Sequence, residues 1–138
     1  MKSRFLPICI FFSLIIGLSV FYSCNNKRPF KIPYEISDGI VIGKENCFVD
    51  TAKDYWLINL TVYPNTKQYG DTISLNGVKY TNVVKALGLK APFNQIGKRV
   101  SLSFTLSKDH VQTDGCDVSS PVTYDLKILK IISEGYVP

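Results

Sequence analysis

The sequence predicts a small, mainly β domain that follows an export segment. Apolar and polar residues alternate with a period of two along much of the chain after Tyr34, and an Asn76-Gly77 pair lies between two such stretches. Alternation of this kind is typical of strands with one buried face. Asn-Gly favours a two-residue hairpin turn, because both residues tolerate a positive φ. About 105 residues follow the N-terminal segments, which suits one domain with a modest core.

The first half of this domain predicts three strands. The first is expected from Ile36 to Asn46 and the second from Asp54 to Tyr63, where Pro64 would end it. The third belongs to a hairpin formed by residues 72–75 and 78–80 around the Asn-Gly turn.

A short helix is expected after the hairpin. Thr81 or Asn82 can cap its start, and Gly88 can end it. The residues that would face the core are Val83, Val84 and Leu87.

Two further strands follow. The fourth includes Val100 to Leu106, and a long polar loop is expected from Ser107 to Ser120. The last strand begins after Pro121, and its apolar positions change phase near Ile128, which indicates a bulge there.

This order of elements, five strands with a helix between the third and fourth, resembles the OB-fold, a small five-stranded Greek-key barrel. The resemblance covers Ile36 to Ile132 and depends on element order, not on a signature motif. A small β-sandwich built from the same strands is the alternative.

The first 24 residues have the features of an export signal. Lys2 and Arg4 precede an apolar run from Phe5 to Tyr22, and Ser23 stands before Cys24. The segment resembles the signal of a Gram-negative lipoprotein, which is cut before a cysteine that carries acyl chains. The resemblance implies that residues 1–23 are removed and that Cys24 anchors the protein to a membrane.

Two alternatives remain for this segment. The apolar run is nearly long enough to stay as a membrane helix, or it is an ordinary secretory signal that leaves Cys24 unmodified. In each case the domain lies outside the cytoplasm. With a lipid anchor, it would face the periplasm or the cell surface from the inner or outer membrane.

The chain's net charge of +5 belongs to its N-terminal segments. Five of the 16 basic residues precede Tyr34, while all 11 acidic residues follow it, so the body is neutral. A neutral body without a basic stripe argues against nucleic-acid binding, which requires neutralisation of phosphates.

Cys47 and Cys116 are the two cysteines of the body, and an exported domain with one such pair is expected to form a disulfide. In an OB barrel the two loops that contain them lie at the same end, so a bridge is geometrically reasonable. A metal site is not expected, because the sequence has no CxxC motif and only one histidine, His110.

No residue set predicts catalysis, and no cofactor is expected. His110 with Asp109 and Asp114 could form a general base, but a solvated loop histidine is the favoured interpretation because no motif places a nucleophile.

The strongest candidates for a ligand face are four tyrosines expected to point outward on or near the second and third strands. They are Tyr55, Tyr63, Tyr69 and Tyr80. Simple cross-strand packing is the favoured alternative for these tyrosines.

The sequence therefore divides into a signal peptide (1–23), a lipidated Cys24 with a basic tether (24–34), an OB-like barrel (35–133) and a short tail (134–138). The expected function is a lipid-anchored envelope protein that binds a peptide, a protein or a glycan and is not an enzyme. A structural accessory subunit of an envelope complex is the alternative.

Overall fold

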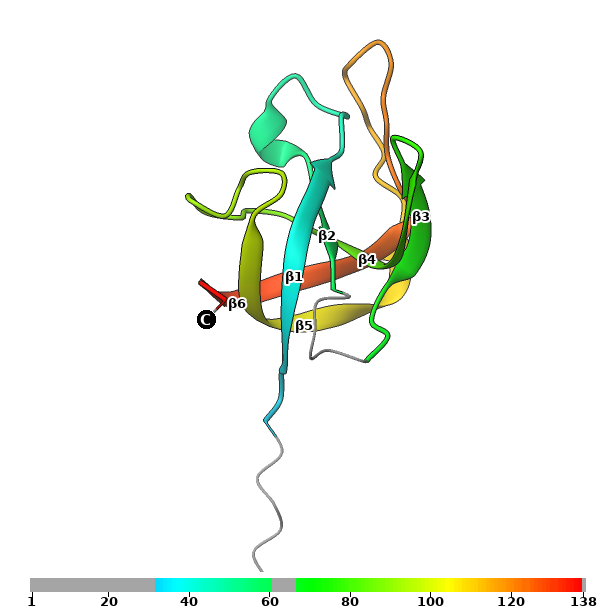
Figure 1. Cartoon of the computed structure of the whole chain (residues 1–138). Helices are drawn as coiled ribbons and strands as arrows, with labels where there is room; N and C mark the ends of the chain where they lie inside the picture. The colour runs from blue at the N-terminus through cyan, green and yellow to red at the C-terminus, as the bar shows by residue number, and fades with distance from the viewer. Residues whose placement is uncertain (1–31, 61–66, 138) are drawn as a thin grey trace, which may run out of the picture. The chain divides into compact units, whose positions relative to one another are not determined.

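A computed structural model describes residues 32–60 and 67–137, and these residues form a mainly β structure (Figure 1). The strands are β1 (Glu35–Lys44), β2 (Trp56–Asn59), β3 (Asp71–Leu75), β4 (Val78–Ala86), β5 (Arg99–Val111) and β6 (Leu126–Gly135). The helical segment η1 (Thr51–Lys53) is a single 3₁₀ turn between β1 and β2. The β-rich class is therefore confirmed.

All six strands belong to one mixed sheet in the order β2-β1-β5-β6-β4-β3, with an additional pairing between β2 and β4. Because of this pairing, hydrogen-bonded neighbours lead from β1 through β2, β4, β6 and β5 back to β1. The β4–β6 pair is parallel and the others are antiparallel. The described residues thus form a single sheet and not the two sheets of a sandwich.

Both faces of the central strands are buried. Consecutive residues of a strand point to opposite faces, and here the neighbours Val83 and Val84 belong to two different hydrophobic clusters. The larger cluster includes Ile58, Val84 and Phe104, and the smaller one includes Leu57 and Val83. The β3–β4 hairpin contributes Ile73, Leu75 and Tyr80 to the smaller cluster.

The helix expected at residues 81–88 is wrong, because this segment continues strand β4 to Ala86. Val83 and Val84 are fully buried and β-branched, which suits a strand covered on both faces. Asn82 caps no helix: its Oδ1 accepts hydrogen bonds from the backbone N–H groups of Tyr69 (2.9 Å) and Gly70 (2.8 Å).

The hairpin turn is confirmed, with Asn76 and Gly77 at φ of 50° and 78°. The second strand is shorter than expected, and residues 61–63 of the expected strand lie outside the described residues. The loop expected from Ser107 was wrong in its first part, since β5 extends to Val111.

The irregularity expected near Ile128 is present, but the additional residues are in the partner strand. Leu106 pairs with Leu129, and the next pair joins His110 to Lys127. Three residues of β5 therefore lie opposite Ile128 alone. The backbone N–H of Ile128 donates to Ser107 Oγ (2.8 Å), which satisfies it where the strand pairing is interrupted.

No helix in the described part of the chain is long and apolar enough to cross a membrane. The expected signal, Cys24 and the tether as far as Lys31 lie outside the described residues.

Candidate functional site

An open groove of about 460 Å³ lies between strand β6 and the segment that follows β4. We call it the β4–β6 groove. Its lining residues are Tyr55, Leu87, Gly88, Lys90 and Ile128–Glu134. This volume falls in the range of about 300–1,000 Å³ that is typical of ligand sites.

The backbone creates the groove where two parallel strands separate. β4 pairs with β6 only through Lys85 with Ile128 and Ala86 with Leu129. Gly88 then adopts a positive φ of 77°, and residues 87–90 leave the strand conformation. From Lys130 to Gly135, β6 is paired with β5 on one side, and in the described residues no strand covers the other side.

The groove combines apolar walls with charged margins. Leu87 and Ile132 are 47% and 55% exposed, although both are large aliphatic residues. Lys90 and Lys130 are also exposed. Glu134 lies close to Lys90, and its two carboxylate oxygens accept from the Lys90 backbone N–H at 3.2 and 3.3 Å.

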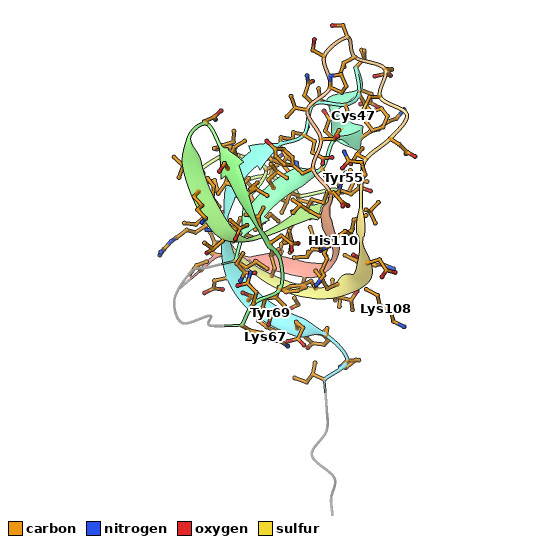
Figure 2. All side chains as sticks on the ribbon, turned by 90° about the vertical axis from the view of Figure 1, so that its right-hand side faces the viewer. Cys47, Tyr55, Lys67, Tyr69, Lys108 and His110 are labelled. Carbon is orange, nitrogen blue, oxygen red and sulfur yellow. A yellow bond between two sulfur atoms is a disulfide. The ribbon has the colours of Figure 1, made fainter. Side chains whose placement is uncertain are left out.

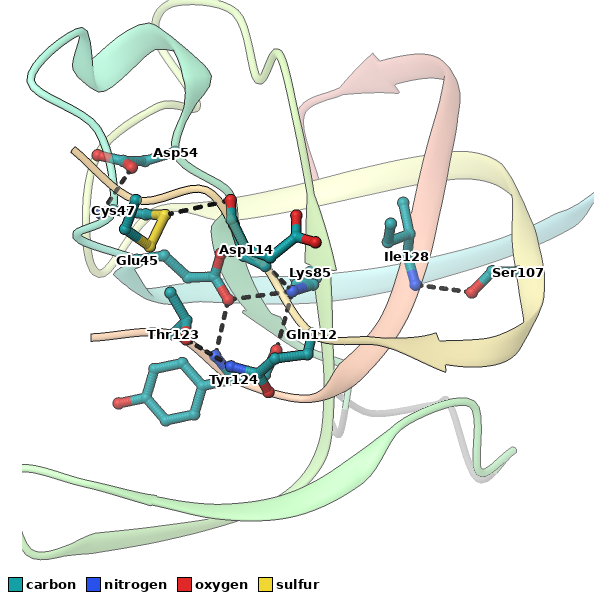
Figure 3. Close-up of polar contacts among 12 residues, drawn as sticks. Glu45, Cys47, Asp54, Lys85, Ser107, Gln112, Asp114, Thr123, Tyr124 and Ile128 are labelled. Atoms are coloured by element: carbon teal, nitrogen blue, oxygen red, sulfur yellow. Dashed lines mark hydrogen bonds and ion pairs between the residues drawn. A yellow bond between two sulfur atoms is a disulfide. The ribbon is translucent and has the colours of Figure 1, made fainter. Parts of the chain in front are cut away.

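Next to the groove, a lysine and a glutamate are completely buried (Figure 3). Lys85 Nζ donates to Glu45 Oε1 (3.1 Å), Thr113 Oγ1 (2.7 Å) and the carbonyl of Tyr124 (2.8 Å). Thr113 Oγ1 and the Tyr124 N–H in turn donate to the Glu45 carboxylate at 2.6 and 2.9 Å. All three protons of the ammonium group are therefore used, which a buried charge requires.

Tyr55 connects this buried network to the groove. The Lys85 ammonium lies 4.9 Å from the centroid of the Tyr55 ring, which is within cation–π distance. The same tyrosine is part of the groove lining. Tyr55 therefore contacts the buried Lys85 ammonium and also lines the groove.

The loops above this pair are held together covalently. Cys47 in the β1–β2 loop (residues 45–55) and Cys116 in the β5–β6 loop (residues 112–125) form the expected disulfide. Backbone hydrogen bonds between Asn46 and Val122 run in both directions (3.0 and 2.8 Å), and the Asp117 N–H donates to the Cys47 carbonyl (2.9 Å). The disulfide and these hydrogen bonds join the two loops, and Lys85 bonds to the second of them.

The four tyrosines expected to form a ligand face do not share one surface. The expectation that Tyr69 points outward is wrong, because the residue is only 7% exposed and its ring packs against Phe104 with centroids 5.2 Å apart. Tyr80 packs on the smaller hydrophobic cluster, and Tyr63 lies outside the described residues. Of the three tyrosines that the structure describes, Tyr55 lines the groove. Tyr55 lies toward the disulfide end of the body and Tyr69 toward the other end (Figure 2).

His110 was expected in a loop, and the structure places it in strand β5. Its Nε2 lies 3.0 Å from Asp71 Oδ2, so its carboxylate partner comes from β3 and is neither Asp109 nor Asp114. Within residues 32–60 and 67–137, no three side chains of the metal-binding types are grouped to hold an ion.

Sequence patterns did not predict the buried pair or the groove. Lys85 is a charged residue between the apolar residues Val84 and Ala86, which is an unusual position once the segment is assigned to a strand. Its partner Glu45 is 40 residues away, and a single sequence gives no signal that pairs them. The groove depends on where the backbone of β4 leaves β6, which side-chain periodicity does not encode.

The chain shows no significant match to any family model, curated protein or solved structure.

Proposed function

We propose that this protein is a lipid-tethered binding module, in which a small OB-like barrel is held to a membrane through Cys24 and binds a segment of a partner polypeptide in the β4–β6 groove. The observation that carries the proposal is the groove itself, an open site with exposed aliphatic walls beside an incompletely paired strand. Exposed aliphatic side chains gathered around one groove suit contact with the apolar side chains of a partner.

The strand pairings support the OB-like part of the proposal. Five strands close into a ring, and the one parallel pair joins β4 to β6. The expected short helix is absent from this ring, and the β3 arm is attached to it. The OB resemblance is therefore proposed for the barrel and not for every element around it.

The geometry also agrees with a tether at the N-terminus. The disulfide-linked loops lie at the opposite end of the body from the start of β1 (Figures 1 and 2). Residues 24–34 span at most about 40 Å when fully extended. A lipid on Cys24 would therefore keep the start of β1 within about 40 Å of the bilayer.

The test is to select binders from a random peptide library with the full chain in detergent micelles. Selected peptides should bind the protein in fluorescence anisotropy, and Leu87→Glu and Ile132→Glu should each weaken binding at least tenfold, or about 1.4 kcal/mol. Val78→Glu is the matched control, because Val78 is 50% exposed and lies on the β3–β4 hairpin. Failure to select peptides, or binding that the groove variants leave unchanged, would overturn the proposal.

A further inference from the structure

We infer that the β4–β6 groove binds its partner by strand addition: an extended segment pairs with the open edge of β6 and carries an acidic side chain toward Lys90 and Lys130. This inference rests on the proposed function and specifies its ligand. Three features of the groove support it, namely the edge of the sheet, the aliphatic walls and the balance of charge.

The edge of β6 supplies the backbone partners. Between Lys130 and Gly135 the strand is paired with β5 only, in the part of the chain that the structure describes, and a register shift leaves Ile132 without a partner in β5. Such an edge presents N–H and C=O groups that another extended chain can pair with. At about 3.3 Å per residue, these six residues offer an edge of roughly 20 Å.

Residues 87–90 do not pair with this edge. The pairing with β6 ends at Ala86, two residues before the turn at Gly88, and the Glu134 side chain accepts from the Lys90 backbone N–H. The lining of the groove therefore includes both the open edge and the segment facing it.

The walls suit alternating side chains. An added strand would point every second residue into the groove, where Leu87, Ile128 and Ile132 provide aliphatic contacts. A glycan fits this lining less well, because sugar rings stack on exposed aromatic faces. The only aromatic residue in the lining is Tyr55, which is half-buried and already has the Lys85 ammonium against its ring.

The charge of the groove selects for an acidic residue. In the described residues, neither Lys90 nor Lys130 forms an ion pair, and both are exposed. Glu134 is the only acidic residue in the lining, and its carboxylate accepts from a backbone N–H. A carboxylate on the added segment would complement the two free ammonium groups.

The experiment uses the selected peptides and chemical variants of their backbone. N-methylation of a single peptide nitrogen removes one N–H donor. If the peptide adds as a strand, methylation at every second position should weaken binding at least tenfold, while methylation at the positions between should have little effect. Amide hydrogens of residues 130–135 should exchange more slowly in the complex.

The charge contacts are tested separately. Replacing each acidic residue of a selected peptide with its amide should weaken binding, and that loss should disappear in the double variant Lys90→Gln/Lys130→Gln. Lys79→Gln/Lys127→Gln is the control, because both of these lysines lie outside the groove lining.

The outcomes separate the two proposals. Peptides that bind in the groove but tolerate N-methylation at every position, or that show no acidic preference, would overturn strand addition and leave the groove as a binding site. Peptides whose binding ignores Leu87→Glu and Ile132→Glu would overturn the proposed function itself.

Discussion

At the scale of single residues, the fully buried Lys85–Glu45 ion pair carries a large desolvation cost. Removing two charges from water costs several kcal/mol per ion, and that cost is offset only when hydrogen bonds satisfy both groups. Here the two side chains are fully buried, and each of them also bonds to the β5–β6 loop through Thr113 and Tyr124. The pair therefore connects this loop to strand β4.

Lys85→Met should lower the free energy of unfolding by about 3–5 kcal/mol, because it leaves the Glu45 carboxylate buried without its counter-charge. The double variant Lys85→Met/Glu45→Leu should be more stable than the single variant, since it removes the stranded charge. Urea unfolding followed by far-UV circular dichroism measures both values. Lys53→Met is the control, because its ion pair with Asp50 is exposed and contributes at most about 1 kcal/mol. An equal effect of Lys53→Met and Lys85→Met would contradict the assignment.

Tyr69 gives a second prediction at this scale. Burial raises the pKa of its hydroxyl from 10.0 to about 12, and the hydrogen bond to Glu35 Oε2 and the charge of that carboxylate act in the same direction. The folded protein thus holds this proton more tightly than the unfolded chain does. The contribution is fully present below pH 10 and is lost as the pH rises from 10 to about 12.

Tyr69→Phe keeps the ring against Phe104 and removes the titrating group. The stability difference between the native protein and this variant should be constant below pH 9 and should shrink between about pH 10 and 12. Urea unfolding at a series of pH values measures this difference, in which the other titrating groups cancel. A difference that does not change with pH would show that the hydroxyl titrates normally in the folded state.

At the scale of secondary-structure elements, the β3–β4 hairpin acts as a cover for the smaller hydrophobic cluster. Its turn requires a positive φ at two consecutive residues, and Gly77 adopts 78° without steric cost. The hairpin should therefore be sensitive to any side chain at this position.

Gly77→Ala should lower the free energy of unfolding by about 1–2 kcal/mol, because a Cβ makes the left-handed conformation unfavourable. The matched control is Gly135→Ala: an added Cβ at Gly135 meets no atom within 4 Å, and its φ lies outside the positive range. That control should change stability by no more than about 0.5 kcal/mol. A greater loss in the control than in Gly77→Ala would contradict this account of the turn.

The elements also show what a single sequence can predict. The β class and the Asn76-Gly77 turn were predicted, because each depends on local patterns that a short window contains. The helix expected at residues 81–88 was wrong, because Asn82 and Gly88 are residue types that often cap helices. In the structure Asn82 instead accepts hydrogen bonds from the Tyr69 and Gly70 N–H groups, and Gly88 turns the chain after strand β4 ends. Burial on both faces of β4 also removed the period-two signal that would have identified it.

The site was less predictable than the fold for a related reason. The Tyr69 ring is buried while its hydroxyl donates a hydrogen bond to Glu35. The alternation of apolar and polar residues does not predict that Glu35 lies beside this hydroxyl. Lys85 lies in β4 and Glu45 in the β1–β2 loop, 40 residues apart in the sequence, and the groove arises from the relative paths of β4 and β6. Long-range contacts of this kind depend on tertiary structure, which periodicity does not report.

At the scale of the whole molecule, the disulfide closes a large loop. It joins residues 69 positions apart, so it limits the unfolded chain strongly. Loop-closure entropy for this length corresponds to about 4 kcal/mol. Cys47→Ser/Cys116→Ser should lower the free energy of unfolding by about that amount, measured by urea unfolding without reductant. Reductant should destabilise the native protein and leave the double variant unchanged, and an effect on both would contradict this explanation.

The anchor is tested by the intact mass of the full chain after extraction from membranes. We expect a mass equal to residues 24–138 plus acyl chains, since Ser23-Cys24 follows the apolar run of a lipoprotein-like signal. Reduction should add about 2 Da, because Cys47 and Cys116 would be joined outside the cytoplasm. An unacylated mass that begins near Cys24 would instead indicate an ordinary secretory signal, and the mass of the uncut chain would indicate a membrane helix. Either of these results would overturn the lipid tether while leaving the groove and its proposed ligand open to their own tests.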